Sequence, residues 1–271
     1  MKRVAADQKG EAQTMGQRTP TLIDLSDCIS NDTSNFEPNP HHITYVSHAE
    51  AYGMVARYGL RPEFFAPGHA WAVENLTLST HSGTHVDAPY HYAPTSGGAP
   101  ARTIDQLPLA WFYSDSVLLD VRSKPAGDGI SAEDVRRELA RIGYTLKPLD
   151  IVLVWTGTSA HFHEKGYDQM HAGLRADATR WLVEAGVKVI GIDAWGLDRP
   201  FTVMAQEAAA GHPEVFWESH FYGSEREYCQ IEKLAHLEQL PRPFGFRVAC
   251  FPYNIRGASA AWTRAVAIFE E

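Results

Sequence analysis

Cysteine is scarce in this chain of 271 residues, which contains only Cys28, Cys229 and Cys250. The three lie far apart, and no pair has the C-x-x-C spacing of a zinc or redox motif. An odd, scattered set of thiols argues against a disulfide framework. It is typical of a protein that keeps its cysteines reduced, so we expect a cytoplasmic location.

The sequence also lacks long hydrophobic runs and basic clusters. No apolar stretch approaches the roughly 20 residues that a membrane helix needs, and residues 1–20 lack the apolar segment of a signal peptide. The formal net charge of -9 gives no electrostatic support to nucleic-acid binding. We therefore expect neither a membrane nor a nucleic acid as a partner. We expect residues 1–20 to form a flexible tail, or an arm that packs on a partner subunit.

The remaining composition is that of an ordinary globular protein. Hydrophobic residues make up 44% of the chain and charged residues 21%, which provides enough apolar material for a sizeable core. The length fits one large domain. Because no repeat and no clear linker divides the chain, we expect residues 21–271 to form a single domain.

Strand and helix patterns alternate through the middle of the chain. A helix over Ser131–Ile142 is the clearest, because Ser131 and Asp134 have capping-box spacing and Gly143 stands where the helix should end. Other helical patterns cover Ala49–Arg57 and Leu174–Ala185. Strand patterns cover Thr21–Ile29, Trp71–Thr80, Ser116–Val121, Asp150–Trp155, Val187–Ile192, Phe246–Pro252 and Arg264–Phe269. This order predicts an α/β fold with a mixed sheet.

The segment His81–His91, HSGTHVDAPYH, contains three histidines and one aspartate. Because imidazole and carboxylate groups are common metal ligands, so dense a group indicates a metal site. A helix is disfavoured by Gly83 and Pro89. A straight strand would separate His81 from His85 by roughly 13 Å, too far for two ligands of one ion. The chain must therefore bend between them, and Gly83 is the residue that bends most easily.

This bend leaves His85 and Asp87 on a recovered extended stretch. Three side chains, those of His81, His85 and Asp87, can then ligate a metal ion, and His91 is left over. An imidazole beside a metal-bound water is suited to accept or donate a proton near neutral pH. The alternative for His91 is a fourth ligand or a residue that only supports the ligands.

The segment resembles the H-x-G-T-H-x-D-x-P-x-H signature of the cyclase superfamily, which includes bacterial kynurenine formamidase (arylformamidase) and isatin hydrolase. The resemblance continues through Gly173-Leu174 to Asp193 and covers most of the chain from Thr21 to Phe269. It implies a swivelling β/β/α-type fold, metal-dependent hydrolysis of amides and, commonly, a dimer, so we expect a homodimer or a higher homo-oligomer.

The resemblance also implies roles for single residues. His81, His85 and Asp87 match the metal ligands of the motif, and His91 matches its proton donor and acceptor. In the formamidases a further histidine, followed twelve residues later by a glutamate, completes a two-metal site. His220 and Glu232 have that spacing.

The role of the family's glutamate can be assigned to Glu232, because Ile231-Glu232-Lys233-Leu234 is similar to the family's I-L-E-G-L segment, with Lys233 in place of the glycine. His220 has two neighbours, His212 and Glu218, that could compete for its role.

A shared site of this kind has a clear chemical use. Carboxylates of Asp87 and Glu232 that bridge two divalent ions would hold a water that loses its proton near neutral pH. With nitrogen and oxygen ligands the ion is zinc or manganese, and one or two ions can bind. The small-molecule substrate is expected to be an amide, a formamide or a cyclic amide, cleaved at its C–N bond.

Three alternatives stay open at this point. The same site can serve an ester or lactone hydrolase, or a metal-binding protein without catalysis. Two histidines and a carboxylate can also hold iron in a dioxygen enzyme. A serine hydrolase is disfavoured, because no G-x-S-x-G elbow surrounds Ser82.

The walls of the expected pocket are less well defined by the sequence. We expect the N-terminal extension and the long loop Asn31–His42 to reach toward it. His161 and His163 are expected to be surface histidines, and Asp193 is expected to support the structure by hydrogen bonds. Aromatic candidates for the walls, of which an aryl-substrate pocket would use one or two, are Trp71, Tyr90, Tyr92, Trp111, Trp195 and Trp217.

Overall fold

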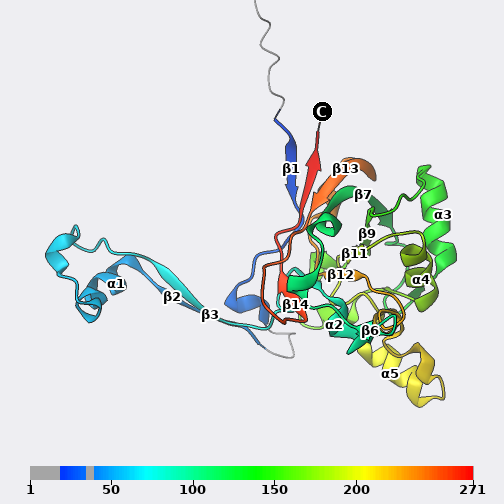
Figure 1. The fold of residues 1–271 in the computed structure, drawn as a ribbon, viewed down its shortest axis with the longest axis horizontal. Helices are drawn as coiled ribbons and strands as arrows, with labels where there is room; N and C mark the ends of the chain where they lie inside the picture. Colours follow the sequence, from blue (N-terminus) through cyan, green and yellow to red (C-terminus); the bar gives the residue numbers. More distant parts are fainter. Residues whose placement is uncertain (1–18, 35–39, 271) are drawn as a thin grey trace, which may run out of the picture.

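A nine-stranded mixed sheet runs through the body of the protein in the order β1-β15-β13-β7-β9-β11-β12-β4-β14 (Figure 1). The computed structural model describes residues 19–34 and 40–270. The strands of this sheet are β1 (Thr21–Asp24), β4 (His85–Asp87), β7 (Tyr113–Asp120), β9 (Ile151–Trp155), β11 (Val189–Ile192), β12 (Cys229–Glu232), β13 (Phe244–Ala249), β14 (Ala260–Trp262) and β15 (Val266–Phe269). Strands β7, β9, β11 and β12 are parallel, and the flanking strands are antiparallel.

Apolar side chains fill both faces of the parallel strands. In β9, Val152 and Val154 belong to the core cluster that includes α3 and α4, whereas Ile151 and Leu153 belong to the cluster on the opposite face. Alternation of this kind buries every residue of a continuous apolar run. The helices are α1 (His48–Met54), α2 (Pro89–Tyr92), α3 (Ala132–Ile142), α4 (Ala176–Glu184), α5 (Phe201–Ala209) and α6 (Glu218–Tyr222).

The central prediction of a single α/β domain with a mixed sheet is confirmed. Helix α3 begins after Ser131, whose side chain forms a capping box with Asp134, and it ends at Gly143 in the left-handed conformation. The second predicted helix is α4, and the two predicted buried strands are β9 and β11. No helix of the described ranges is long and apolar enough to cross a membrane.

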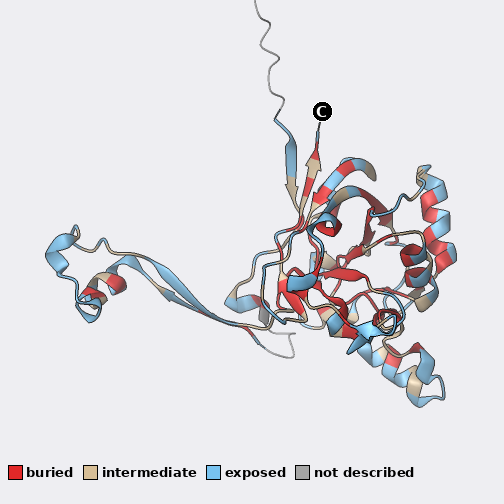
Figure 2. Cartoon of the chain, in the orientation of Figure 1, coloured by how far each residue is buried: buried red, intermediate tan, exposed pale blue. Residues whose placement is uncertain are grey.

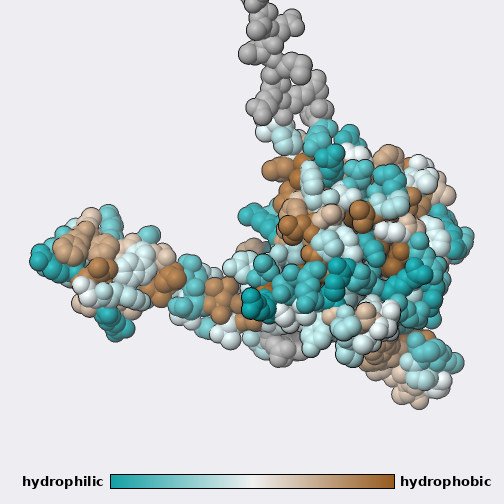
Figure 3. All heavy atoms as spheres, in the orientation of Figure 1, coloured by the Kyte–Doolittle hydropathy of each residue, from teal (hydrophilic) through white to brown (hydrophobic). Residues whose placement is uncertain are grey.

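A long arm projects from the body of the protein (Figure 1). It comprises residues 42–77, in which β2 (His42–Val46) pairs with β3 (Val73–Thr77) and encloses α1. The strand predicted over Trp71–Thr80 is therefore real, but it lies outside the central sheet and is exposed on both faces. Figure 2 shows that exposed residues dominate the arm, and Figure 3 shows hydrophobic residues along it.

Besides β2–β3, the short strands form two further two-stranded pairs. These are β5 (Thr95–Ser96) with β6 (Ala99–Pro100), and β8 (Gly129–Ile130) with β10 (Gly173–Leu174). Most of the predicted N-terminal tail lies outside the described residues, and the boundary at residue 20 stays a prediction.

Candidate metal centre

The short strand β4 carries the centre of the histidine segment and lies between β12 and β14. His85 of β4 pairs directly with Glu232 of β12 in the antiparallel register. Residues that face each other in this way have their side chains on the same side of the sheet. Strand pairing therefore brings Glu232 to the histidine segment across a long stretch of sequence.

The predicted bend before β4 is present at Gly83, which has a φ of 63°. A Cβ there would also lie 2.6 Å from Cγ1 of Ile29, so the position favours glycine in both respects. After β4, Pro89 starts the short helix α2, and this helix turns His91 back toward Asp87. The predicted extended conformation is thus present at His85 and Asp87, whereas His91 lies on a helix.

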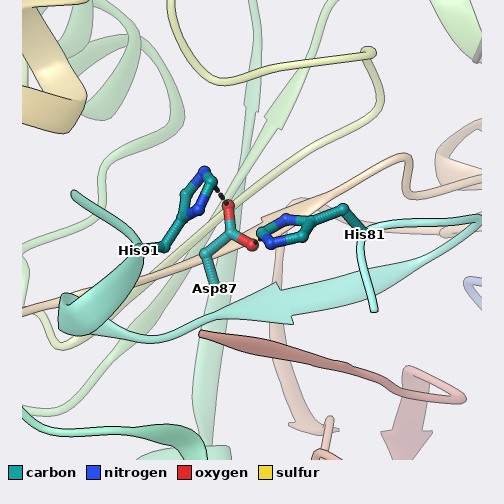
Figure 4. A group of neighbouring side chains, drawn as sticks. All are labelled: His81, Asp87 and His91. Carbon is teal, nitrogen blue, oxygen red and sulfur yellow. Dashed lines mark ion pairs between the residues drawn. The ribbon is translucent and has the colours of Figure 1, made fainter. Parts of the chain in front are cut away.

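The two oxygens of Asp87 face different histidines, as Figure 4 shows for His81 and His91. Oδ1 lies 2.9 Å from Nδ1 of His81 and 3.2 Å from Nε2 of His85. Oδ2 lies 4.0 Å from Nε2 of both His91 and His220. The carboxylate therefore connects two sets of nitrogen atoms.

The carboxylate of Glu232 is divided between histidines in the same way. Oε2 lies 3.5 Å from Nε2 of His85, and Oε1 lies 3.6 Å from Nε2 of His220. All six predicted residues are thus brought together around two carboxylates that each face both sets. Two groups of donor atoms have the mutual spacing of a metal site: His81, Asp87 and His91, and His85, Asp87 and Glu232.

Hydrogen bonds behind the histidines decide which ring nitrogen faces the centre. Nδ1 of His85 lies 2.8 Å from the carbonyl oxygen of Gly83, which can only accept, so this nitrogen carries the proton. Nδ1 of His220 lies 2.5 Å from Oδ2 of Asp198 and donates in the same way. Both Nε2 atoms therefore turn a lone pair toward the carboxylates, as metal-bound histidines do.

This arrangement leaves buried acceptors facing one another. Among the described residues, Nε2 of His85 and both carboxylate oxygens of Asp87 have no hydrogen-bond partner. Lone pairs that meet at about 3 Å without a proton repel each other, and burial increases the repulsion. A cation between them removes the repulsion, so the residues present fit a divalent metal ion.

The charges of the centre also favour a bound cation. Burial opposes ionisation of Asp87, but the surrounding histidines His91, His85 and His81 outweigh it and hold the pKa of its carboxyl well below the usual range. Burial, together with the charge of Asp87, raises the pKa of Glu232 well above its usual range. Two carboxylates so close together favour a bound cation. Burial lowers the pKa of His91 to about 4, so its imidazole is neutral at pH 7.

A cavity of about 210 Å³ opens onto this centre. Its apolar wall contains Trp195, Phe201, Met204 and Trp217. Two of the six aromatic candidates thus line the cavity. Among the others, Tyr92 and Trp111 are buried in the core clusters, and Trp71 packs against Tyr58 in the arm.

The expectation that the Asn31–His42 loop lines the pocket is not met by its described residues. Asn31 instead bonds to the backbone of Ile43, and Thr33 bonds to His41. These contacts fasten the loop to the base of the arm, and none of its described residues is among those that line the cavity. The tip of the loop, residues 35–39, lies outside the described residues.

Four other predictions have clear outcomes. His161 and His163 are exposed, and each is paired with a carboxylate, as expected of surface histidines. Asp193 accepts hydrogen bonds from Thr156 and Gly157, which is the expected structural role. The two competitors of His220 lie elsewhere: Glu218 pairs with Arg175, and His212 is exposed beside Glu214.

The sequence analysis missed Asp198 as a partner of the centre, and it named Trp217 only as a candidate for the pocket wall. Asp198 orients His220, and Gly173 lies so close behind it that a Cβ would be 2.1 Å from the Asp198 carbonyl carbon. Trp217 has a left-handed φ of 55° and stacks on His220, with ring centroids 4.3 Å apart. A bulky residue in that conformation is a signal of function, but it is visible only in the structure.

Comparison with known proteins places these features in a family. The family described as "Putative cyclase" matches residues 23–199, a range that contains the histidine segment and ends before His220. Cyclase-like protein 1 of Arabidopsis thaliana is 28% identical over 204 residues, which cover 72% of this chain and 69% of that protein. A kynurenine formamidase of Maricaulis maris is 29% identical over 194 residues, covering 72% and 79%.

Solved structures share the fold. An isatin hydrolase bound to the product analogue thioisatinate superposes with a TM-score of 0.72 at 17% identity, covering 93% of each chain. Isatin hydrolase A from Ralstonia solanacearum superposes with a TM-score of 0.70 at 23% identity, covering 93% of this chain and 92% of the other. Since the family match spans well over half of its length, this chain belongs to the "Putative cyclase" family.

Proposed function

We propose that this protein is a metal-dependent hydrolase that cleaves the C–N bond of an amide, a formamide or a cyclic amide. The observation that carries the proposal is the buried pair of Nε2 of His85 and Oδ1 of Asp87, which lie 3.2 Å apart and have no hydrogen-bond partner within the described part of the chain. Relatives described as kynurenine formamidases and fold neighbours described as isatin hydrolases support the substrate class.

The proposed ligands divide between two positions that share both carboxylates. His81, His85, Asp87 and Glu232 would hold an ion at the first position, and His220 with the other oxygens of the two carboxylates faces the second. Zinc and manganese both suit nitrogen and oxygen ligands. A divalent ion at this place supplies a water nucleophile at neutral pH and polarises a carbonyl oxygen.

His91 is the proposed proton carrier. Its imidazole lies at the cavity, within 4.0 Å of Asp87, and is neutral at pH 7 because burial lowers its pKa to about 4. A neutral imidazole can take the proton of the attacking water and then give it to the leaving nitrogen. The indoles of Trp195 and Trp217 offer flat apolar walls for a ring of the substrate.

Removal of the metal tests this function. Protein treated with a chelator is expected to lose turnover of formanilides and cyclic amides by roughly 10³-fold or more, since metal activation of water contributes several kcal/mol. Zinc or manganese should restore it, under argon as well as in air. A metal-free protein that keeps its turnover, or an activity that needs oxygen, would contradict the proposal. Matched amide and ester substrates, compared by kcat/KM, separate an amidase from an esterase.

We also propose that two copies of the chain form a homodimer through the arm. A two-stranded hairpin without a covering partner is marginally stable in water. The large apolar side chains of the arm that are 41% to 68% exposed are Tyr45, Tyr58, Phe64, Val73 and Leu76. A second copy is the proposed partner, because a two-fold contact buries the same apolar surface on both subunits.

Paired substitutions on the arm test the dimer. Phe64→Ser with Leu76→Ser is expected to convert a dimer into a monomer, as measured by light scattering after gel filtration. The control is Leu22→Ser with Leu109→Ser, which changes two side chains of the body that are 62% and 67% exposed. A monomeric wild-type protein, or an arm variant that remains dimeric, would contradict this arrangement.

A further inference from the structure

His171 lies on the cavity wall and uses only one of its two ring nitrogens. The residue is 1% exposed, and its Nε2 lies 3.0 Å from the carbonyl oxygen of Asp198. Because a carbonyl oxygen can only accept, Nε2 carries the proton and donates it. Burial lowers the pKa of His171 to about 4, so the ring is neutral at pH 7 and Nδ1 keeps its lone pair.

No described residue donates a hydrogen bond to this lone pair. Nδ1 of His171 lacks a partner within the described part of the chain, and a buried acceptor without a donor is costly. Two other atoms of the cavity lining, Nε1 of Trp195 and Nε of Arg199, are donors that also lack partners, so neither of them serves Nδ1. Outside the metal centre, Nδ1 is therefore the unpaired buried side-chain acceptor among the described residues of the lining.

The segment around His171 is fixed against the segment that orients His220. Asp198 bonds to His171 through its backbone carbonyl and to His220 through its carboxylate. Gly173 packs so closely on this segment that a Cβ there would lie 2.2 Å from the backbone nitrogen of Arg199. His171 and the proposed ligand His220 are thus held by one residue, and both line the cavity.

We propose that Nδ1 of His171 accepts a hydrogen bond from the N–H of the scissile amide, and so selects N–H amides over esters and N-alkylated amides. The inference deepens the hydrolase function proposed above and rests on it. A secondary amide or an N-unsubstituted cyclic amide has an N–H to donate, whereas an ester and a tertiary amide have none.

This bond positions the leaving nitrogen without a transfer of its proton. The attacking water gives its hydroxyl to the carbonyl carbon, and the proton of that water passes through His91 to the nitrogen as the C–N bond breaks. The nitrogen keeps its original proton on Nδ1 of His171, which stays neutral throughout. His171 is therefore a residue that sets specificity, and it is distinct from the proton carrier.

Two substitutions of His171 separate this role from a structural one. His171→Gln places an amide nitrogen where Nε2 was, so the bond to Asp198 can be kept, but it removes the acceptor at Nδ1. His171→Asn does the reverse, since its amide oxygen takes the place of Nδ1. The readout is the ratio of kcat/KM for an N–H substrate to that for its N-methyl form. Formanilide and an N-unsubstituted cyclic amide are each measured in this way, and metal content shows that each variant is folded.

We expect the ratio to fall at least ~10-fold in His171→Gln, the effect of one hydrogen bond to a buried acceptor, and to stay near the wild-type value in His171→Asn. A structural role predicts the opposite order of the two variants. The matched control is His41→Gln, because His41 is also buried and bonds to a backbone carbonyl, that of Ser30, but lies outside the cavity lining. This control should keep the wild-type ratio.

Two results would overturn the role of His171. One is a wild type that hydrolyses the N-methyl forms as readily as the N–H forms, and the other is an unchanged ratio in His171→Gln protein that retains its metal. A wild type that binds no metal and turns over neither kind of amide would instead refute the proposed function itself.

Discussion

Asp87→Asn is expected to remove both metal retention and turnover. Asp87 is fully buried, and its two oxygens face different histidines. An amide offers one oxygen and one NH₂ group, and the NH₂ group cannot bind a metal. It also lacks the negative charge that offsets a buried cation. We expect turnover to fall by roughly 10³-fold or more, since the metal contribution is several kcal/mol, and metal content to fall below one ion per chain.

The matched control is Asp120→Asn. Asp120 also stands on a strand of the central sheet, but it pairs with Arg122 outside the cavity lining. Loss of a partly exposed ion pair changes stability by about 1 kcal/mol or less, so this protein should keep its metal and its turnover. An Asp87→Asn protein that holds one ion per chain through dialysis would show that the metal binds elsewhere.

The local half of the centre could be predicted from the sequence because all its parts lie in eleven residues. His81, His85 and Asp87 must converge within a few ångströms if they share an ion, and that requirement alone placed the bend at Gly83. The structure has the bend there. The helical turn that carries His91 was not predicted, because a four-residue helix has too little periodicity to be recognised.

The distant half of the centre, His220 and Glu232, depends on contacts between segments far apart in the sequence. Local sequence patterns do not reveal such contacts. The local sequence does not show whether His220 or one of its neighbours, His212 and Glu218, is the further ligand. Asp198, 22 residues earlier in the chain, distinguishes His220, because it fixes the ring of this histidine. The pairing of β4 with β12 places Glu232. Family resemblance supplied the choice of His220 and Glu232 where sequence periodicity could not.

The arm shows a different limit of prediction from sequence patterns. The alternation over Trp71–Thr80 predicts a strand correctly, because backbone period and side-chain pattern agree. Alternation also implies one buried face, and β3 has none within the chain. The apolar side chains of the arm are the ones that a second copy would cover. The pattern is consistent with the fold if the proposed dimer, and not the single chain, is the folded unit.

His91→Ala is expected to lower kcat by ~10²–10⁴-fold while metal content stays unchanged, because general acid–base catalysis contributes about that much. Nε2 of His91 lies 4.0 Å from Oδ2 of Asp87 and the ring lines the cavity, as suits a residue that moves protons between a water in the centre and the substrate. Added imidazole should restore part of the turnover. His161→Ala, at an exposed histidine paired with Glu164, should change neither quantity. Loss of metal together with turnover in the His91 variant would make this residue a ligand, which is the alternative that the histidine segment leaves open.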